Sequence, residues 1–240
     1  EIIPLYYNLE GVVYGDDINL SPSDFYNQMR NGKMPTTMAC NPDTAEKCFR
    51  KYLEQGLDVL HIAFSSALSS SYNTTAVIAR DLSEEYKNNK VIVIDSKCAS
   101  MGEGLFVYNA ICNRENDMSI DENVKWLENN KLHFCHQFTV DDLHHLHRGG
   151  RVSRATAIIG TMINVKPVLH VDNDGQLISL SNVRGRKKAL NTLVDNMEKE
   201  YKNYKNDIVF ISHGDCLDDA QYVAELIKKR LGIQNFLINY

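Results

Sequence analysis

The spacing of apolar residues divides the chain into alternating strand-like and helical segments. Short runs rich in β-branched and aromatic residues predict strands, and longer runs with apolar residues three or four positions apart predict helices. The predicted strands cover residues 2–7, 58–64, 91–94, 133–140, 167–171, 176–180, 207–212 and 236–239. The predicted helices cover residues 21–31, 43–55, 72–87, 101–113, 121–130, 153–164, 186–201 and 218–231.

This alternation predicts an α/β fold with two domains. In the first half, strands alternate with long helices, which favours a parallel sheet covered on both faces. In the second half, residues 172–175 (DNDG) separate two strands as a hairpin turn does, and two helix–strand units follow. We therefore expect a parallel-sheet α/β/α domain over residues 1–133 and a smaller mixed-sheet, two-layer α/β domain over residues 134–240. The clearest helical stripe in the second domain consists of Leu190, Leu193, Val194, Met197 and Tyr201.

Composition narrows the classes of function. The 240 residues carry a net charge of -5, which disfavours nucleic acid as the main partner because phosphate recognition requires a basic face. The six cysteines are scattered without CxxC spacing, as in reduced cytosolic proteins, and no apolar run approaches the length of a membrane span. We expect a cytoplasmic protein. The chain begins at Glu1 without an initiator methionine, so it is expected to be a piece of a longer one.

A serine-rich segment lies between a predicted strand and a predicted helix. Residues 65–71 (SSALSSS) follow the strand over residues 58–64. Parallel sheets bind ligands at the carboxyl ends of their strands, and a helix start offers free N–H groups to an anion. Serine is also a preferred helix cap, so the residue types alone leave anion binding and simple capping both open.

Five ordered blocks of the chain resemble the motifs of the DegV family. Residues 64–72 are similar to the family's strand–S-S-x-L-S-G-T-Y–helix, and residues 34–37 are similar to part of its P-x-T-S-Q-P. Residues 93–102 resemble V-I-D-S-x-x-x-S-x-G, and residues 138–153 resemble F-x-V-D-D-L-x-x-L-x-R-G-G-R-I-S. The last block consists of residues 166–167 and 184–189.

The resemblance implies a bacterial protein that binds a long-chain fatty acid in a tunnel between the two domains, the second domain closing over the acyl chain. The family's ligand-binding Thr and Ser fall on Thr37 and Ser69, and further candidates are Ser70 and Ser71 beside Ser69 and Ser100 in the block over residues 93–102. A partner fatty acid kinase would phosphorylate the bound carboxylate. The resemblance thus implies a carrier with no catalytic residue, metal or cofactor of its own, and it allows transient contact with a membrane.

Some positions depart from the family pattern. Residues 38–40 (MAC) stand where the family usually has Ser-Gln-Pro, so the edge of the site is expected to differ. Residues 70–71 are Ser-Ser in place of Gly-Thr. The family's opening strand–Asp-Ser segment is absent before Glu1, and its closing H-T-G-P-G segment is absent after Tyr240. We expect either that the chain is trimmed or that part of a full site is missing from it.

The remaining clusters of functional residue types allow other interpretations. Charge alone favours solvated loops for Arg148, Arg151, Arg184 and Arg186, whereas the resemblance favours docking of the kinase or its phosphates. Five histidines between residues 133 and 147 invite a metal site, but strand alternation places His133 and His136 on opposite faces. Gly102-Glu103-Gly104 is an incomplete dinucleotide motif. A serine hydrolase or acyl transferase acting through Ser69, with His213 as its base, is the alternative function.

Overall fold

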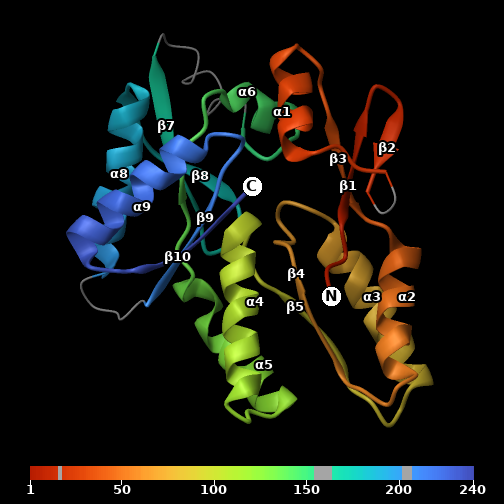
Figure 1. Ribbon diagram of the computed structural model, residues 1–240. Helices are drawn as coiled ribbons and strands as arrows, with labels where there is room; N and C mark the ends of the chain where they lie inside the picture. Colours follow the sequence, from red (N-terminus) through yellow and green to blue (C-terminus); the bar gives the residue numbers. More distant parts are fainter. Residues whose placement is uncertain (16–17, 154–163, 202–206) are drawn as a thin grey trace. The chain divides into compact units, whose positions relative to one another are not determined.

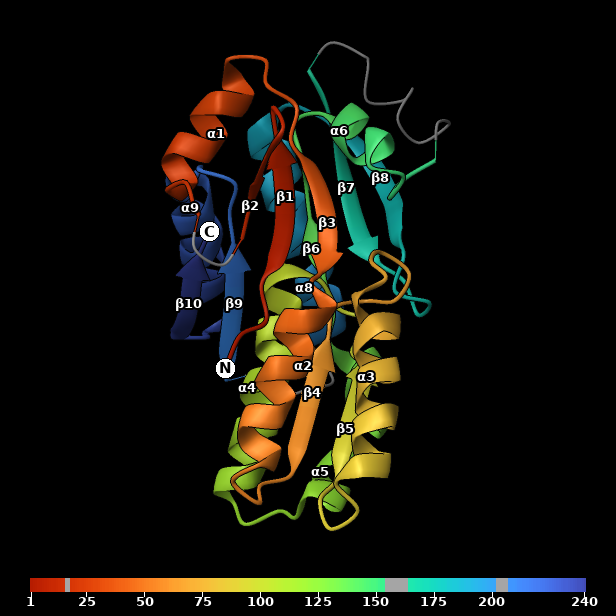
Figure 2. The ribbon, with the colours of Figure 1, turned by 90° about the vertical axis from the view of Figure 1, so that its right-hand side faces the viewer.

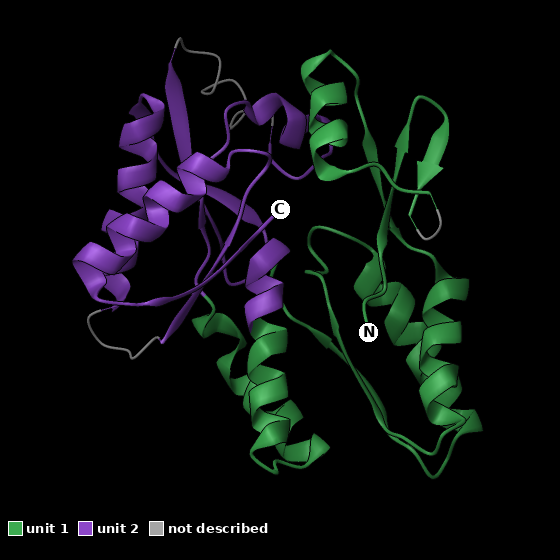
Figure 3. Ribbon diagram, in the orientation of Figure 1, with its two compact units in different colours: residues 1–99, 106–134 green, residues 100–105, 135–240 purple. Residues whose placement is uncertain are grey.

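The computed structural model describes residues 1–15, 18–153, 164–201 and 207–240. These residues form two compact units (Figure 3). Unit 1 comprises Glu1–Ala99 and Phe106–Phe134, and unit 2 comprises Ser100–Leu105 and Cys135–Tyr240. Helix α4 (Ser100–Glu115) therefore contributes its first residues to unit 2 and the rest to unit 1. The two units are compact groups of residues and do not test whether the chain folds as two independent domains. The predicted domain boundary between residues 133 and 134 therefore stays a prediction.

Unit 1 begins with a three-stranded antiparallel sheet in the order β2-β1-β3 (Figure 1). Its strands are β1 (Leu5–Leu9), β2 (Val12–Tyr14) and β3 (Thr36–Cys40), and helix α1 (Pro22–Arg30) lies between the second and third along the chain. Tyr7 stacks on Tyr14 across the hairpin with ring centroids 4.9 Å apart. Thr37 is paired with Tyr7 in the register of β3 and β1, so the sheet fixes the position of β3.

The second sheet of unit 1 is a parallel pair, β4 (Val59–Ala63) and β5 (Val91–Asp95). It lies between α2 (Pro42–Leu53) and α3 (Ser71–Glu85) on one face and α4 and α5 (Ile120–Asn130) on the other (Figures 1 and 2). Alternate strand residues serve the two faces, as a period of two requires. Val59, Val91 and Val93 pack with the buried Phe49 and Leu82, and Leu60, Ile62 and Ile92 pack with the buried Phe106 and Leu127. The predicted cover on both faces is confirmed.

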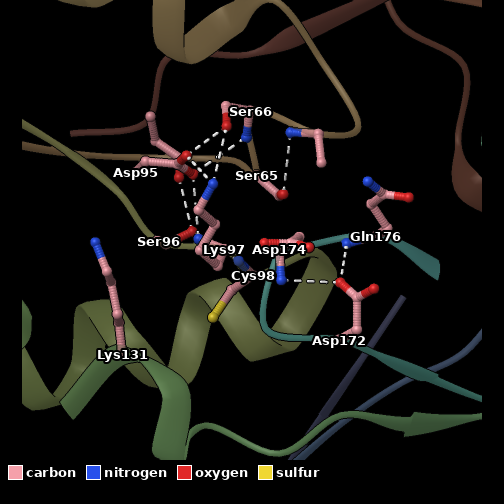
Figure 4. Close-up of polar contacts among 12 residues, drawn as sticks. Ser65, Ser66, Asp95, Ser96, Lys97, Cys98, Lys131, Asp172, Asp174 and Gln176 are labelled. Atoms are coloured by element: carbon pink, nitrogen blue, oxygen red, sulfur yellow. Dashed lines mark hydrogen bonds and ion pairs between the residues drawn. The ribbon is translucent and has the colours of Figure 1, made fainter. Parts of the chain in front are cut away.

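Unit 2 contains an antiparallel sheet in the order β6-β7-β8, formed by β6 (Gln137–Phe138), β7 (Val165–Val171) and β8 (Leu177–Arg184). The predicted hairpin turn is confirmed: the Gly175 N–H donates to Asp172 O at 3.0 Å, and Gly175 has a φ of 82°. The Asp172 carboxylate accepts the backbone N–H groups of Asp174 and Gln176 (Figure 4).

The rest of unit 2 consists of two long helices and a pair of parallel strands. The helices are α8 (Arg186–Tyr201) and α9 (Leu217–Leu231), and the strands are β9 (Ile208–Ser212) and β10 (Asn235–Asn239). The apolar stripe predicted for residues 186–201 is confirmed, since Leu190 and Val194 are buried and Met197 and Tyr201 pack against the same core as Ile227. No helix among the described residues has the length and apolar character needed to cross a bilayer.

The prediction of a long strand over residues 133–140 is wrong. Residues 131–133 form a 3-10 turn (η1, Lys131–His133) that continues from α5, and only Gln137–Phe138 is a strand. That strand pairs antiparallel with β7 in unit 2 and so does not extend the parallel sheet of unit 1. The sequence pattern also missed β2, β3 and the short helix α6 (Leu143–Arg148). The helix predicted over residues 153–164 falls on residues 154–163, which lie outside the described residues.

Candidate functional site

The serine-rich segment forms a tight turn between the end of β4 and the start of α3. Ser65 is fully buried at its beginning, where its N–H donates to Cys98 O at 2.9 Å. Its carbonyl accepts the N–H groups of Leu68 at 3.0 Å and Ser69 at 3.1 Å. The turn is thus closed on itself and held against the residues that follow β5. Such a turn at the carboxyl end of parallel strands is where this architecture binds ligands.

Three hydrogen bonds connect Ser69 with the end of β3. The hydroxyls of Ser69 and Ser71 lie 2.9 Å apart, and Ser69 Oγ also accepts the Ser71 N–H at 3.2 Å. Ser71 is buried, and its Oγ accepts the backbone N–H of Cys40 at 3.1 Å. The structure therefore brings Ser69 and Ser71 together and fastens both to the strand that carries Thr37.

Two other residues of the predicted site in unit 1 lie on the surface. Thr37 is exposed on β3, three residues before Cys40. Ser70 is exposed at the N-cap of α3, where its side chain makes no capping hydrogen bond. Ser65 and Ser71 are thus buried and hold the frame of this region, whereas Ser69 is partly accessible and Thr37 and Ser70 are exposed.

Ser100 belongs to unit 2, unlike the serines of the turn. It is exposed, has a φ of 53°, and shares a hydrogen bond of 2.7 Å with the hydroxyl of Ser212. Two residues further, the position of a Cβ on Gly102 would lie 1.8 Å from His136 Nε2. A close approach of the His136 ring therefore explains this glycine, and the incomplete dinucleotide motif is part of helix α4.

A buried carboxylate at the end of β5, that of Asp95, also belongs to this region, although the sequence analysis assigned it no role. Asp95 accepts the Ser66 N–H at 3.1 Å and the Lys97 N–H at 3.2 Å, and it pairs with the Lys97 ammonium at 2.8 Å (Figure 4). Burial by itself raises the pKa of Asp95, but the hydrogen bonds from Lys97 and Ser66 outweigh it and hold the pKa below 3.8. The sequence signal that could have identified this residue is an Asp directly after the apolar run of a predicted strand.

The four arginines predicted to dock a partner have different surroundings in unit 2. Arg148 and Arg184 are exposed, and Arg151 is partly buried with a hydrogen bond from its guanidinium to Gly149 O. Arg186 is engaged internally: its Nε lies 2.8 Å from Asp219 Oδ2 and its Nη1 lies 3.8 Å from Asp141 Oδ1. Asp141 in turn pairs with Lys166 at 2.6 Å. Arg186 therefore braces the start of α8 against the start of α9.

The contacts of Ser69 offer no support for a hydrolase. Among the described residues its hydroxyl bonds to Ser71, and no histidine is hydrogen-bonded to it. His213, the general base in the alternative hydrolase function, lies in unit 2, where its Nδ1 accepts the Cys216 N–H at 3.3 Å. Within the described ranges, no three His, Cys, Asp or Glu side chains lie close enough together to hold a metal ion.

Comparison with known proteins assigns the chain to a family. The model of the DegV family, described as an uncharacterised protein family, matches residues 1–240. A DegV domain-containing protein of Clostridium perfringens is 40% identical over 235 residues, which are 97% of this chain and 81% of that protein.

Solved structures share the fold. A DegV family protein of Thermus thermophilus, described for its fatty acid binding, is 27% identical, with a TM-score of 0.83 over 99% of this chain and 83% of its own. The fatty acid kinase B3 protein of Streptococcus pneumoniae, loaded with linoleic acid, is 20% identical, with a TM-score of 0.86 over 98% and 82%. The chain is a member of the DegV family.

Proposed function

We propose that this protein binds a long-chain fatty acid, with the acyl carboxylate at Ser69 and Thr37, and presents it to a fatty acid kinase. The observation that supports this proposal most directly is the hydrogen-bonded connection from Ser69 through Ser71 to Cys40. It joins a serine at the start of α3 to the strand that carries Thr37, the two positions that the family motifs assign to the ligand.

The chemistry of this region suits a carboxylate. A helix start carries partial positive charge, and hydroxyl and N–H donors there can bond an anion without adding a full charge. About 14 methylenes buried at roughly 0.8 kcal/mol each contribute on the order of 11 kcal/mol before ordering costs. Each hydrogen bond to the carboxylate adds about 1.5–3 kcal/mol. The acyl chain thus supplies most of the affinity, and the hydroxyls orient the acid.

The kinase step is the finer part of the proposal. The Streptococcus pneumoniae protein is described as a fatty acid kinase B3 protein loaded with linoleic acid, and the Thermus thermophilus protein is described for fatty acid binding. In this chain, Arg148, Arg151 and Arg184 are the basic residues proposed to dock the kinase, and Arg186, which was predicted to join them, is paired with Asp219. Nucleic acid is not a proposed partner, and transient membrane contact and a cytoplasmic location remain part of the proposal.

Lipid extraction tests the binding step. Protein purified after expression in bacteria should release long-chain fatty acid, identified by mass spectrometry in an amount close to that of the protein. Extracts from several preparations that contain only phospholipid, or no lipid, would contradict the proposal. The carrier role is tested separately: the protein alone should hydrolyse no ester, and acyl phosphate should form only with the kinase and ATP.

A further inference from the structure

The turns after β4 and β5 are joined through one buried carboxylate, that of Asp95. Only 9% of Asp95 is exposed, and its two oxygens serve both turns at once. Oδ1 accepts the N–H groups of Ser66 and Lys97, and Oδ2 accepts the Ser66 hydroxyl and pairs with the Lys97 ammonium (Figure 4). A carboxylate in this position fixes Ser66 at both its backbone and its side chain.

Lys97 adopts a conformation that L-amino acids rarely take. Its φ is 57°, in the left-handed region, which costs free energy for a residue with a side chain. In this conformation the backbone N–H and the ammonium of the same residue both reach Asp95, and the ammonium also lies 3.3 Å from Ser66 Oγ. The surrounding contacts thus hold Lys97 in a strained geometry that places its charge beside the carboxylate.

Ser66 and Ser69 belong to one short turn that begins at Ser65. Ser66 directly follows Ser65, whose carbonyl accepts the Ser69 N–H at 3.1 Å and whose N–H donates to Cys98 at 2.9 Å. The turn is short and each end is bonded, so a displacement at Ser66 is transmitted to the Ser69 hydroxyl. Asp95 therefore acts on Ser69 through backbone contacts.

We propose that Asp95 and Lys97, which contact the serine turn at Ser66, form a charge-balanced positioning pair. This pair sets the selectivity of the turn for a carboxylate head group. This inference rests on the proposed function. Asp95 holds the turn in place, and Lys97 cancels a negative charge that would otherwise repel the incoming carboxylate. With both residues present, the head group meets neutral donors and no net charge. Neither residue touches the ligand in this proposal.

A purely structural ion pair and a charge-balanced pair predict different effects on head-group selectivity. Loss of a structural pair would weaken all ligands alike, because the turn would move for each of them. Loss of charge balance would change the binding of an anion and leave that of a neutral molecule of equal length nearly unchanged. The informative quantity is therefore the ratio of the affinities for hexadecanoic acid and hexadecan-1-ol.

The experiment measures both affinities by displacement of a fluorescent acyl probe from the whole protein. Lys97→Met should lower the acid-to-alcohol ratio about tenfold, and Asp95→Asn, which leaves the ammonium unpaired, should raise it above that of the wild type. The double variant should return to within about threefold of the wild type, because the charges again balance. Lys97→Arg should change the ratio less than about twofold, since the charge stays.

A matched control comes from the other end of the same strand. Lys90 precedes β5 and pairs with Asp121 on the surface of unit 1, so Lys90→Met removes a Lys–Asp pair far along the strand from the serine turn. The acid-to-alcohol affinity ratio of Lys90→Met should equal that of the wild type. Equal losses for acid and alcohol in Lys97→Met, or a ratio that falls in Asp95→Asn, would overturn the inference while leaving fatty acid binding intact. A wild-type protein that binds neither ligand would overturn both proposals.

Discussion

The polar regions of the two units are built from different chemistry. In unit 1, hydroxyls bond to one another and to the backbone around Ser69, and the buried carboxylate of Asp95 is paired with Lys97. In unit 2, charged side chains form a chain of ion pairs through Asp141, Arg186 and Asp219. The first arrangement is the proposed ligand site, and the second connects the starts of helices α8 and α9. Polar side chains of one chain thus form a network of hydroxyls in unit 1 and a network of ion pairs in unit 2.

The pKa values of two carboxyl groups, Asp95 in unit 1 and Glu103 in unit 2, also differ between the units. The pKa of Asp95 lies below 3.8 because hydrogen bonds from Lys97 and Ser66 outweigh the effect of its burial. Burial raises the pKa of Glu103, in unit 2, to about 7. Asp95 is therefore charged at neutral pH, and Glu103 is partly protonated. The two pKa values differ in direction because the Lys97 ammonium lies beside Asp95, whereas burial dominates at Glu103.

The largest expected effect is the pH dependence that Glu103 confers. A carboxyl with a pKa raised from 4.5 to about 7 on folding binds more protons in the folded state, so stability falls as pH rises through this window. Relative to Glu103→Gln, the wild type should lose up to about 3 kcal/mol of unfolding free energy between pH 4.5 and 7.

Urea denaturation at several pH values measures this loss. Asp95→Asn is the control of opposite sign, because a lowered pKa contributes stability that is present above pH 3.8 and lost as the pH falls through the folded-state pKa. Parallel pH profiles for the wild type and Glu103→Gln would show that Glu103 is solvated and would break the contrast between the two carboxylates.

The next effect concerns two arginines that are two residues apart. Arg186→Met removes the guanidinium that bonds Asp219 and should lower the unfolding free energy by about 1.5–3 kcal/mol, because it removes a hydrogen bond between charged groups. The measurement is urea denaturation at pH 7, with the exposed Arg184→Met as the control. Equal stabilities for the two variants would mean that the ion pairs of unit 2 do not hold its helices.

The regular parts of the fold could be predicted from the sequence because their signals are local. The stripe on α8 repeats at helical spacing, and the Asp172–Gly175 turn has the residues that a hairpin requires. The segment over residues 133–140 misled because its alternation is compatible with a long strand, whereas only two residues pair with β7. Helix α6 has six residues, too few to display a period.

The candidate site could be predicted only in part. Ser69 was identified through its motif, but its frame depends on contacts between residues far apart in the sequence: Ser71 with Cys40, 31 positions away, and Ser66 with Asp95, 29 positions away. A linear pattern contains no signal for such pairs. The same limit applies to Arg184 and Arg186, whose residue type is identical and whose surroundings differ.

Ser69→Ala tests whether the hydroxyl region binds or also presents the ligand. Loss of one hydrogen bond to the carboxylate should cost about 1.5–3 kcal/mol, or about 10- to 150-fold in affinity. Phosphoryl transfer requires closer alignment, so kinase-coupled turnover at saturating lipid should fall further than affinity does. Thr37→Val should follow the same order. A variant that binds tenfold more weakly and turns over normally once saturated would show that Ser69 only tethers the acid.

Ser71→Ala should have a smaller, structural effect. It leaves the buried Cys40 N–H without the Ser71 hydroxyl and should lower the unfolding free energy by about 1–3 kcal/mol. Ser70→Ala is the matched control, because the neighbouring side chain is exposed and makes no capping bond. If both variants unfold at the same urea concentration, the connection between β3 and the turn does not contribute to stability, and the frame proposed for Ser69 is weaker than its geometry indicates.

The smallest effect on stability is expected for Arg184→Glu. Arg184 is exposed at the end of β8, and surface substitutions usually change the unfolding free energy by less than about 0.5 kcal/mol. Fatty acid affinity should also stay within about twofold, because the residue lies in the charged region of unit 2 and surface charges act weakly through water. Kinase-coupled formation of acyl phosphate should nevertheless decline, and Arg151→Glu should behave alike. A variant that loses lipid as strongly as it loses coupling would show that the arginines of unit 2 serve binding, and the division of roles between hydroxyls and charges would then fail.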